Sequence, residues 1–272
     1  MNAPSPQSDA SSRLNAVRER IRRACVTAGR PDTDVSLLAV SKTWDAERVL
    51  ELAALGQRAF GENYLQEALA KIETCAARQA EARDATGTVR QGEAGRPAPI
   101  EWHFIGPIQS NKTRPIAEHF DWVHSIDREK IAARLSEQRP TQRSPLQVCV
   151  QVNVSDEASK SGCEPGEAAA LALKIAQMPG LHLRGLMAIP EPTDDPAIQR
   201  ARFATLRELA KSIAGELQAI DPALALRFDT LSMGMSDDLE AAIAEGATLV
   251  RVGTALFGRR QTLTEASVRP ST

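Results

Sequence analysis

The stretch LSMGMSDDLEAAIAEGATLVRVGTALFG, residues 231–258, contains the end of one strand, a helix and a complete second strand. Leu231 ends an apolar run that begins at Arg227, and residues 249–252 form the next run. Between them, residues 237–245 carry apolar side chains at helical spacing. A strand, a helix and a strand in this order predict a β-α-β unit with parallel strands.

The same alternation extends back to residue 35. Apolar runs typical of strands occupy residues 35–40, 58–60, 101–105, 121–124, 146–154, 181–189, 227–231 and 249–252. Helical patterns occupy residues 45–55, 64–80, 110–119, 128–138, 165–178, 197–219 and 237–245, and an additional amphipathic helix runs from Leu14 to near Gly29. Eight such units are the number that closes a (β/α)8 TIM barrel. The sequence therefore predicts an α/β protein with a single barrel and an extra N-terminal helix.

We expect the barrel domain to span residues 13–258. Residues 1–12 are polar and predict a disordered leader, and residues 259–272 predict a disordered tail. Residues 74–99 are rich in Ala, Arg, Glu and Gly, with almost no large apolar side chain after Cys75. Such a composition cannot bury enough surface to offset its ordering entropy, so it predicts a helix extension followed by a mobile surface insertion.

Composition narrows the classes of partner. The formal net charge is -2 and the pI is about 6.2, which gives no electrostatic reason to expect nucleic acid or an anionic membrane. The four cysteines are scattered, so we expect reduced thiols and no bound metal. The chain begins without a signal peptide and contains no apolar run long enough to span a bilayer, which predicts a cytoplasmic protein. No unusual apolar stripe remains once the helices are packed, so a monomer is expected.

Two loops at the predicted mouth of the barrel have the composition of a phosphate site. In such barrels the loops after strands seven and eight often bind phosphate. The seventh strand leads into Ser232-Met233-Gly234-Met235-Ser236, and the eighth leads through Arg251 into Gly253-Thr254. Taken singly, Ser236 could be only a helix N-cap and Gly253 only a turn residue. Their occurrence on neighbouring strands favours phosphate binding.

Lys42 follows the first strand, which adjoins the eighth strand in a closed barrel. Partly apolar surroundings at the end of a buried strand lower the pKa of an amine and favour Schiff-base formation. The position is also compatible with a lysine that only reaches water. A phosphorylated aldehyde held by the two loops would reach this amine, and pyridoxal 5'-phosphate (PLP) fits that requirement.

Several segments resemble one known family. They are AVSKT (39–43), FGENYLQE (60–67), WHFIGPIQSNK (102–112), HSID (124–127), NVSDEASKSG (153–162), RGLMAIP (184–190) and residues 231–258. Together they resemble the YggS/PROSC family of pyridoxal phosphate homeostasis proteins over most of residues 14–258. The resemblance implies a barrel like the N-terminal domain of bacterial alanine racemase, with PLP held as an internal aldimine.

By position in these motifs, the resemblance also implies residue roles. Lys42 resembles the Schiff-base lysine, and Arg251 resembles the arginine that faces the pyridine nitrogen. The phosphate cradle would consist of Ser232, Ser236, Gly253 and Thr254, with Gly234 in the same loop. Because an arginine cannot accept a proton from the pyridinium, electron withdrawal by the ring would be modest. Asn63 either approaches the cofactor or caps the helix that follows, and the two roles are compatible.

Three functions fit a lysine beside a phosphate site. The first is a homeostasis protein that holds and delivers PLP without substantial turnover, with apo-enzymes that use PLP as candidate recipients. The second is an amino-acid racemase, but a racemase of this fold takes a tyrosine base from a second domain, and the single tyrosine here is Tyr64. The third, a cofactor-free aldolase, should carry its lysine on a middle strand.

We therefore expect the first function and no enzymatic activity. His103, in the third strand, is interpreted as a core residue, and Lys160, after the fifth strand, as a solvated charge. Neither is assigned a role in the site.

Overall fold

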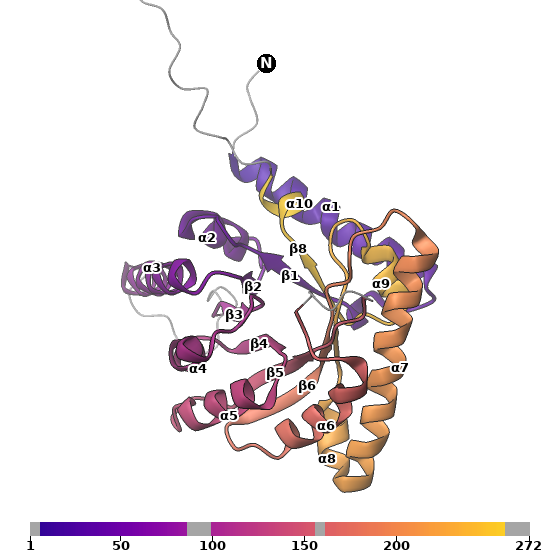
Figure 1. Cartoon of the computed structure of the whole chain (residues 1–272). Coiled ribbons are helices and arrows are strands. Elements are labelled where there is room, and N and C mark those ends of the chain that lie inside the picture. The colour runs from indigo at the N-terminus through magenta and orange to yellow at the C-terminus, as the bar shows by residue number, and fades with distance from the viewer. Residues whose placement is uncertain (1–5, 86–98, 156–160, 259–272) are drawn as a thin grey trace, which may run out of the picture.

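The computed structural model describes residues 6–85, 99–155 and 161–258, and it shows a closed barrel of parallel strands in the order β1 to β8 (Figure 1). The strands are β1 (Ser36–Val40), β2 (Ala59–Glu62), β3 (Glu101–Phe104), β4 (Trp122–Ile126), β5 (Leu146–Gln151), β6 (Leu181–Met187), β7 (Thr230–Ser232) and β8 (Leu249–Val252). The α-helices are α1 (Pro6–Thr27), α2 (Ala46–Ala54), α3 (Leu65–Ala85), α4 (Thr113–His119), α5 (Glu129–Gln138), α6 (Pro165–Ala176), α7 (Pro196–Ile220), α8 (Pro222–Arg227), α9 (Leu239–Ala244) and α10 (Thr254–Phe257). The predicted (β/α)8 barrel is confirmed.

The closure of the barrel places β1 between β2 and β8. Each strand pairs in parallel with the next, and β1 pairs with β8 from Ser36 opposite Leu249 to Ala39 opposite Val252. Because all strands are parallel, their carboxyl ends share one mouth of the barrel. The ends of β2, β1, β8 and β7 are therefore consecutive neighbours at that mouth.

Most of the hydrophobic core lies between the strands and the surrounding helices. Phe60, Phe120 and Phe203 are fully buried in this layer. Two smaller clusters are separate from it: Leu38 with Ile105 and Leu249, and Trp122 with Cys149 and Met187. Residues on one strand alternate between the two faces of a sheet, so the small clusters belong to the lumen of the barrel.

The N-terminal helix begins earlier than the sequence pattern predicts. It starts at Pro6, so residues 6–12 are helical rather than part of a disordered leader. Proline suits the first position of a helix, and Asp9 in the first turn interacts favourably with the helix dipole. Ala10 is buried, which shows that packing also stabilises this extension.

The seventh strand is shorter than predicted. Residues 227–231 were expected to form it, but α8 ends at Arg227 and β7 begins only at Thr230. Pro222 occupies the first turn of α8, and the side chain of Asp221 accepts a hydrogen bond from Ala223 N. This cap and this proline favour a helix in the segment before β7. Apolar composition alone does not distinguish that helix from the start of the strand.

Some sequence predictions fall on parts of the chain that are not described. The helix extension after Thr74 is present, since α3 continues to Ala85, while the rest of the predicted insertion includes residues 86–98, outside the described residues. The tail from 259 onward and Lys160 also lie outside them. Among the helices that are described, none is both long and apolar enough to cross a membrane.

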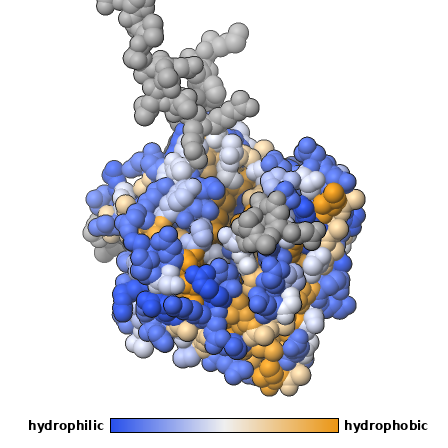
Figure 2. All heavy atoms as spheres, in the orientation of Figure 1, coloured by the Kyte–Doolittle hydropathy of each residue, from blue (hydrophilic) through white to orange (hydrophobic). Residues whose placement is uncertain are grey.

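The surface in Figure 2 is mostly hydrophilic, with hydrophobic atoms gathered at the lower edge, where Figure 1 places α8. Leu226 in α8 is 81% exposed, and Ile220 at the end of α7 is also exposed.

All four cysteines are buried free thiols. Burial raises the pKa of Cys149 and of Cys163 to about 12 in each case.

Candidate functional site

The predicted site residues lie where four neighbouring strands end. Lys42 follows β1, Asn63 follows β2, and Gly253 follows β8. Gly253 lies close to the end of β1, because a Cβ atom added to it would be 3.3 Å from the carbonyl oxygen of Val40. The exposed Thr254 begins the short helix α10 directly after this glycine. The structure thus brings Lys42 and the loop after β8 to the same mouth.

A buried ion-pair cluster, which sequence analysis missed, fixes the backbone beside Lys42. Lys71 Nζ donates hydrogen bonds to the carbonyl oxygen of Ser41 at 2.8 Å, to Glu62 Oε1 at 2.6 Å and to Glu67 Oε1 at 3.0 Å. The Ser41 hydroxyl also donates to Glu62 Oε1 at 2.6 Å. Lys71, Glu62 and Ser41 are buried. We call Ser41, Glu62, Glu67 and Lys71 the Lys71 cluster.

The turn that contains Lys42 is held in an uncommon conformation. Thr43 has a φ of 68°, a left-handed value that is costly for a β-branched residue. Its backbone N–H donates to the Glu67 carboxylate, which holds the turn in place. Lys42 itself is partly buried, and its amine has no hydrogen-bond or ion-pair partner among residues 6–85, 99–155 and 161–258. The backbone is therefore fixed while the amine remains available.

Burial and ion pairing have opposite effects on the charge of Glu62 in the Lys71 cluster. Burial raises its pKa, and the Lys71 ammonium opposes that rise. Both Lys71 and Ser41 contact Oε1, while Oε2 is buried and has no hydrogen-bond partner in the part of the chain that the structure describes. The carboxylate is thus stabilised mainly by a single cation.

The loop between β7 and α9 depends on a glycine. Gly234 has a φ of 93°, and a Cβ atom added to it would lie 2.5 Å from the Cβ of Ala242 in α9. Asp238 Oδ1 accepts a hydrogen bond from Met235 N at 2.6 Å within the same loop. The N-cap of α9 is Asp238, so the structure does not show Ser236 in the N-cap role that its sequence allowed.

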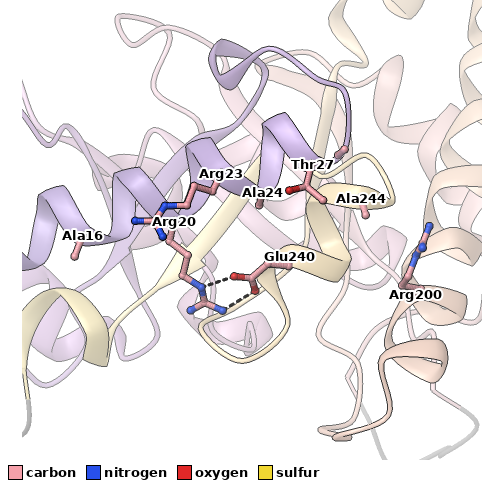
Figure 3. Close-up of a pocket in the computed structure, with 9 residues that line it drawn as sticks. Ala16, Arg20, Arg23, Ala24, Thr27, Arg200, Glu240 and Ala244 are labelled. Atoms are coloured by element: carbon pink, nitrogen blue, oxygen red, sulfur yellow. Dashed lines mark hydrogen bonds and ion pairs between the residues drawn. The ribbon is translucent and has the colours of Figure 1, made fainter.

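Helix α1 holds this loop from the outside of the barrel (Figure 3). Arg20 donates to both carboxylate oxygens of Glu240 at 2.6 Å and to the carbonyl oxygen of Ser236 at 2.6 Å. Arg20 and Glu240 border a cavity of about 660 Å³ between α1, α7 and α9. Arg20, Arg23 and Arg200 line it, and each pairs with a glutamate. Lys42 and the strand ends do not line this cavity.

Ser232 differs from its predicted role in the phosphate cradle. Its hydroxyl is fully buried, lies 2.8 Å from His124 Nδ1 and accepts a hydrogen bond from Arg251 Nη1 at 2.8 Å. A side chain at the end of β7 that points into the lumen meets these buried polar groups rather than the mouth. Ser232 therefore supports Arg251 instead of offering a free hydroxyl to a phosphate.

Arg251 is a buried cation within the lumen. Nη1 also donates to the carbonyl oxygen of Ser232 at 2.6 Å, and Nη2 donates to that of Ala188 at 2.7 Å. Burial lowers the pKa of Arg251 to about 10, so the guanidinium stays protonated at neutral pH. A guanidinium has five N–H donors, and these bonds use three of them. Two donors remain for a ligand.

Asn63 also has a polar atom without a partner. Its Oδ1 is buried and forms no hydrogen bond with any of the described residues. The Asn63 backbone packs so closely on Gly106 that a side chain at that glycine would clash with the Asn63 carbonyl. The neighbouring Tyr64 is 56% exposed. No group of three or more His, Cys, Asp or Glu side chains suited to a metal occurs in the described part of the chain.

Comparison with known proteins identifies the family of this chain. The sequence model of the alanine racemase N-terminal domain family matches residues 12–261. A Pseudomonas aeruginosa protein named pyridoxal phosphate homeostasis protein is 60% identical over 244 residues, which cover 90% of this chain and 93% of the relative. The Escherichia coli K12 protein of the same name is 48% identical over 252 residues, covering 93% and 97% of the two chains.

A solved structure extends the likeness to three dimensions. PipY of Synechococcus elongatus, described as having PLP bound, is 36% identical with a TM-score of 0.68, over 92% of this chain and 100% of PipY. The likeness covers nearly the full length of both chains. This chain therefore belongs to the YggS/PROSC family of pyridoxal phosphate homeostasis proteins, which have the fold of the alanine racemase N-terminal domain.

Proposed function

We propose that this chain binds PLP at the mouth formed by β1, β2, β7 and β8, with Lys42 as the residue that holds it covalently, and that it acts in PLP homeostasis. The observation that carries the proposal is the free amine of Lys42 on a rigidly held turn, beside a glycine-dependent loop and a buried arginine. PLP supplies an aldehyde that condenses with a primary amine. The relatives and PipY support the assignment through their names and the bound PLP.

The polar groups at the mouth suit the chemistry of PLP. Arg251 has two N–H donors left for an acceptor such as a pyridine nitrogen. Ser236, Gly253 and Thr254 lie on the two loops where barrels often bind phosphate, and Gly234 gives the first loop its shape. Asn63 has a buried oxygen that a ligand or water would satisfy. Ser232 would contribute to PLP binding indirectly, by accepting a hydrogen bond from Arg251.

The chain holds and delivers PLP without substantial turnover in this proposal. The names of the relatives, which describe homeostasis proteins, support it. A cationic Arg251 beside the ring would disfavour a protonated pyridine and so weaken carbanion stabilisation. The protein would act in the cytoplasm as a monomer, with apo-enzymes that use PLP as recipients.

Absorbance of the purified protein tests the covalent assignment. A visible band is expected, and borohydride reduction followed by peptide mass analysis should place the cofactor on Lys42. The band should disappear in Lys42→Ala. A cofactor trapped only on another lysine, or no cofactor after incubation with PLP, would refute the assignment.

Transfer and turnover are tested separately. The loaded protein should restore activity to a PLP-dependent apo-enzyme while a scavenger removes free PLP. Incubation with a panel of amino acids in deuterated water should give no rapid α-proton exchange. Fast exchange or racemisation would instead support the racemase alternative.

A further inference from the structure

A line of polar side chains crosses the lumen of the barrel from one end to the other. Arg251 in β8 contacts Ser232 Oγ, which lies 2.8 Å from His124 Nδ1 in β4. His124 Nε2 lies 2.8 Å from His103 Nδ1 in β3, and His103 Nε2 lies 2.7 Å from Glu101 Oε1. We call these five residues the relay.

The relay connects opposite ends of the strands. Ser232 is the last residue of β7, at the mouth that carries Lys42, whereas Glu101 is the first residue of β3. The four inner members are buried, with at most 3% of their surface exposed, while the Glu101 side chain is 47% exposed. A charge at the far end of the barrel is thus linked by hydrogen bonds to the candidate site.

One pair of histidine tautomers lets every hydrogen bond in the relay run in the same direction. Arg251 donates to Ser232 Oγ, so the serine proton is free to point to His124 Nδ1. Burial beside His103 and Arg251 lowers the pKa of His124 well below its ordinary value, so this ring is neutral. With Nδ1 accepting from Ser232, its proton lies on Nε2. That proton is donated to His103 Nδ1, and His103 Nε2–H is donated to Glu101. Both histidine tautomers are assigned here from the Glu101 carboxylate, which can only accept, and from this common direction.

A line of polar side chains is unusual in the lumen of a barrel, because barrel interiors are usually filled with branched apolar side chains. Burial of polar groups is costly even when their hydrogen bonds are made. Arg251 donates only to neutral oxygens, two carbonyls and a hydroxyl, among the residues described. Through Ser232, His124 and His103, hydrogen bonds connect Arg251 to the carboxylate of Glu101 at the other end of the relay.

The other charged groups near the two ends are few. Beside Glu101, the guanidinium of Arg184 lies over the Trp122 ring and pairs with Asp229. The hydrogen bond from His103 is the main reason that the pKa of Glu101 is lowered. Asp238 is the carboxylate whose charge acts on Arg251.

We propose that Glu101, His103 and His124 are positioning residues for Arg251, which act through Ser232 to fix the guanidinium and balance its charge from the opposite end of the barrel. The inference rests on the proposed function, because Arg251 would transmit this effect to bound PLP. It gives a role to a histidine that the sequence places only in the core. Stacking of His103 on Trp122, with ring centroids 5.2 Å apart, keeps the ring in line.

The first test removes the charge at the exposed end. Glu101→Gln keeps an acceptor for His103 and should fold, because the side chain is half exposed. Loss of a negative charge disfavours a protonated cofactor, so the pH midpoint of the visible band should fall by about 0.3 to 1 unit. Asp229→Asn makes the same charge change at the same rim outside the relay and should leave the midpoint unchanged. An unchanged midpoint in Glu101→Gln, or equal shifts in both variants, would overturn the proposal.

The second test breaks the middle of the relay. His103→Phe keeps the stack on Trp122 but removes both hydrogen bonds, and it should raise the dissociation constant for PLP by about 3- to 10-fold. His103→Gln, whose amide can both accept and donate, should recover most of the affinity. Equal affinity in all three proteins would contradict the proposal.

A third measurement does not depend on PLP and separates this inference from the proposed function. In the unliganded protein, ring ¹⁵N chemical shifts should show the proton of the hydrogen bond between the two histidines on His124 Nε2, and the proton of the hydrogen bond between His103 and Glu101 on His103 Nε2. Protonation of either ring at Nδ1 would overturn the direction of the relay. If the shifts agree but no visible band forms with PLP, the proposed function fails while the relay stands.

Discussion

Replacement of Lys71 by methionine should be among the most destabilising single changes in this protein. Methionine keeps much of the length of the side chain but removes the cation that contacts Glu62 Oε1 at 2.6 Å. Glu62 has no exposed surface, so its carboxylate cannot turn to water. Glu67, the other acidic partner of Lys71, is 31% exposed and can be hydrated.

The loss of unfolding free energy follows from the unpaired Glu62 carboxylate that remains in the variant. Removal of one partner of a buried ion pair typically costs about 3–5 kcal/mol. Glu62 can limit this cost by taking up a proton in the folded state. An ordinary glutamate has a pKa of about 4.3 and a pKa unit corresponds to about 1.36 kcal/mol, so a proton held at pH 7 costs about 3.7 kcal/mol. Loss of the hydrogen bond to the Ser41 carbonyl adds about 1 kcal/mol.

The same reasoning fixes the dependence on pH. Burial raises the pKa of Glu62 in the folded protein, and loss of Lys71 raises it further. A group whose pKa is higher in the folded state stabilises the fold fully below its unfolded pKa, and this stability is lost as the pH rises through the folded pKa. If Glu62 stays protonated in the folded variant, the deficit should shrink by about 2.7 kcal/mol between pH 7 and pH 5.

Urea denaturation followed by tryptophan fluorescence and circular dichroism at both pH values measures the deficit. Lys174→Met is the matched control, since Lys174 and Glu129 form an exposed ion pair at 2.5 Å that should contribute less than about 1 kcal/mol. Adding Glu62→Gln to Lys71→Met should restore most of the loss at pH 7. A deficit as small as that of the control, or one that grows as the pH falls, would refute the electrostatic explanation.

Three further predictions concern the loop after β7 and its neighbours. Ser236→Ala combined with Thr254→Ala should weaken PLP retention, measured by dialysis, and unchanged affinity would exclude both hydroxyls from the phosphate site. Gly234→Ala should lower the unfolding free energy by about 1–3 kcal/mol, checked by thermal melting, because φ is 93° and Ala242 leaves no room for the new methyl group. Arg20→Met should speed amide hydrogen exchange in the loop that contains Ser236, whose carbonyl it binds, and equal exchange in both proteins would show that α1 does not hold the loop.

Much of the fold follows from periodicity in the sequence. The apolar runs of β1 and β8 and the helical patterns between strands are strong enough to give the barrel, and its closure then brings Lys42 beside Gly253. The error at β7 had a visible signal, since an aspartate followed by a proline at 221–222 is typical of a helix start. Apolar composition alone did not reveal this helix start.

The polar supports of the site were harder to predict for a physical reason. Glu67 and Lys71 are four residues apart on α3, a spacing that predicts an ion pair, but nothing local shows that Glu62 joins them. His124 in β4 meets Ser232 in β7 across the lumen, although these strands are not neighbours in the sheet. Such contacts depend on closure of the barrel, so alternation within one strand can indicate the face but not the partner.

The Lys71 cluster and the relay explain how the mouth of this barrel can position an amine and a guanidinium with few other residues. Lys42 is fixed from outside the sheet by the Lys71 cluster, and Arg251 is fixed from inside the lumen by the relay. The Lys71 cluster and the relay have no residue in common. In the proposed function, a covalent anchor at Lys42 and a ring contact at Arg251 that are held by separate networks would favour stable retention of PLP.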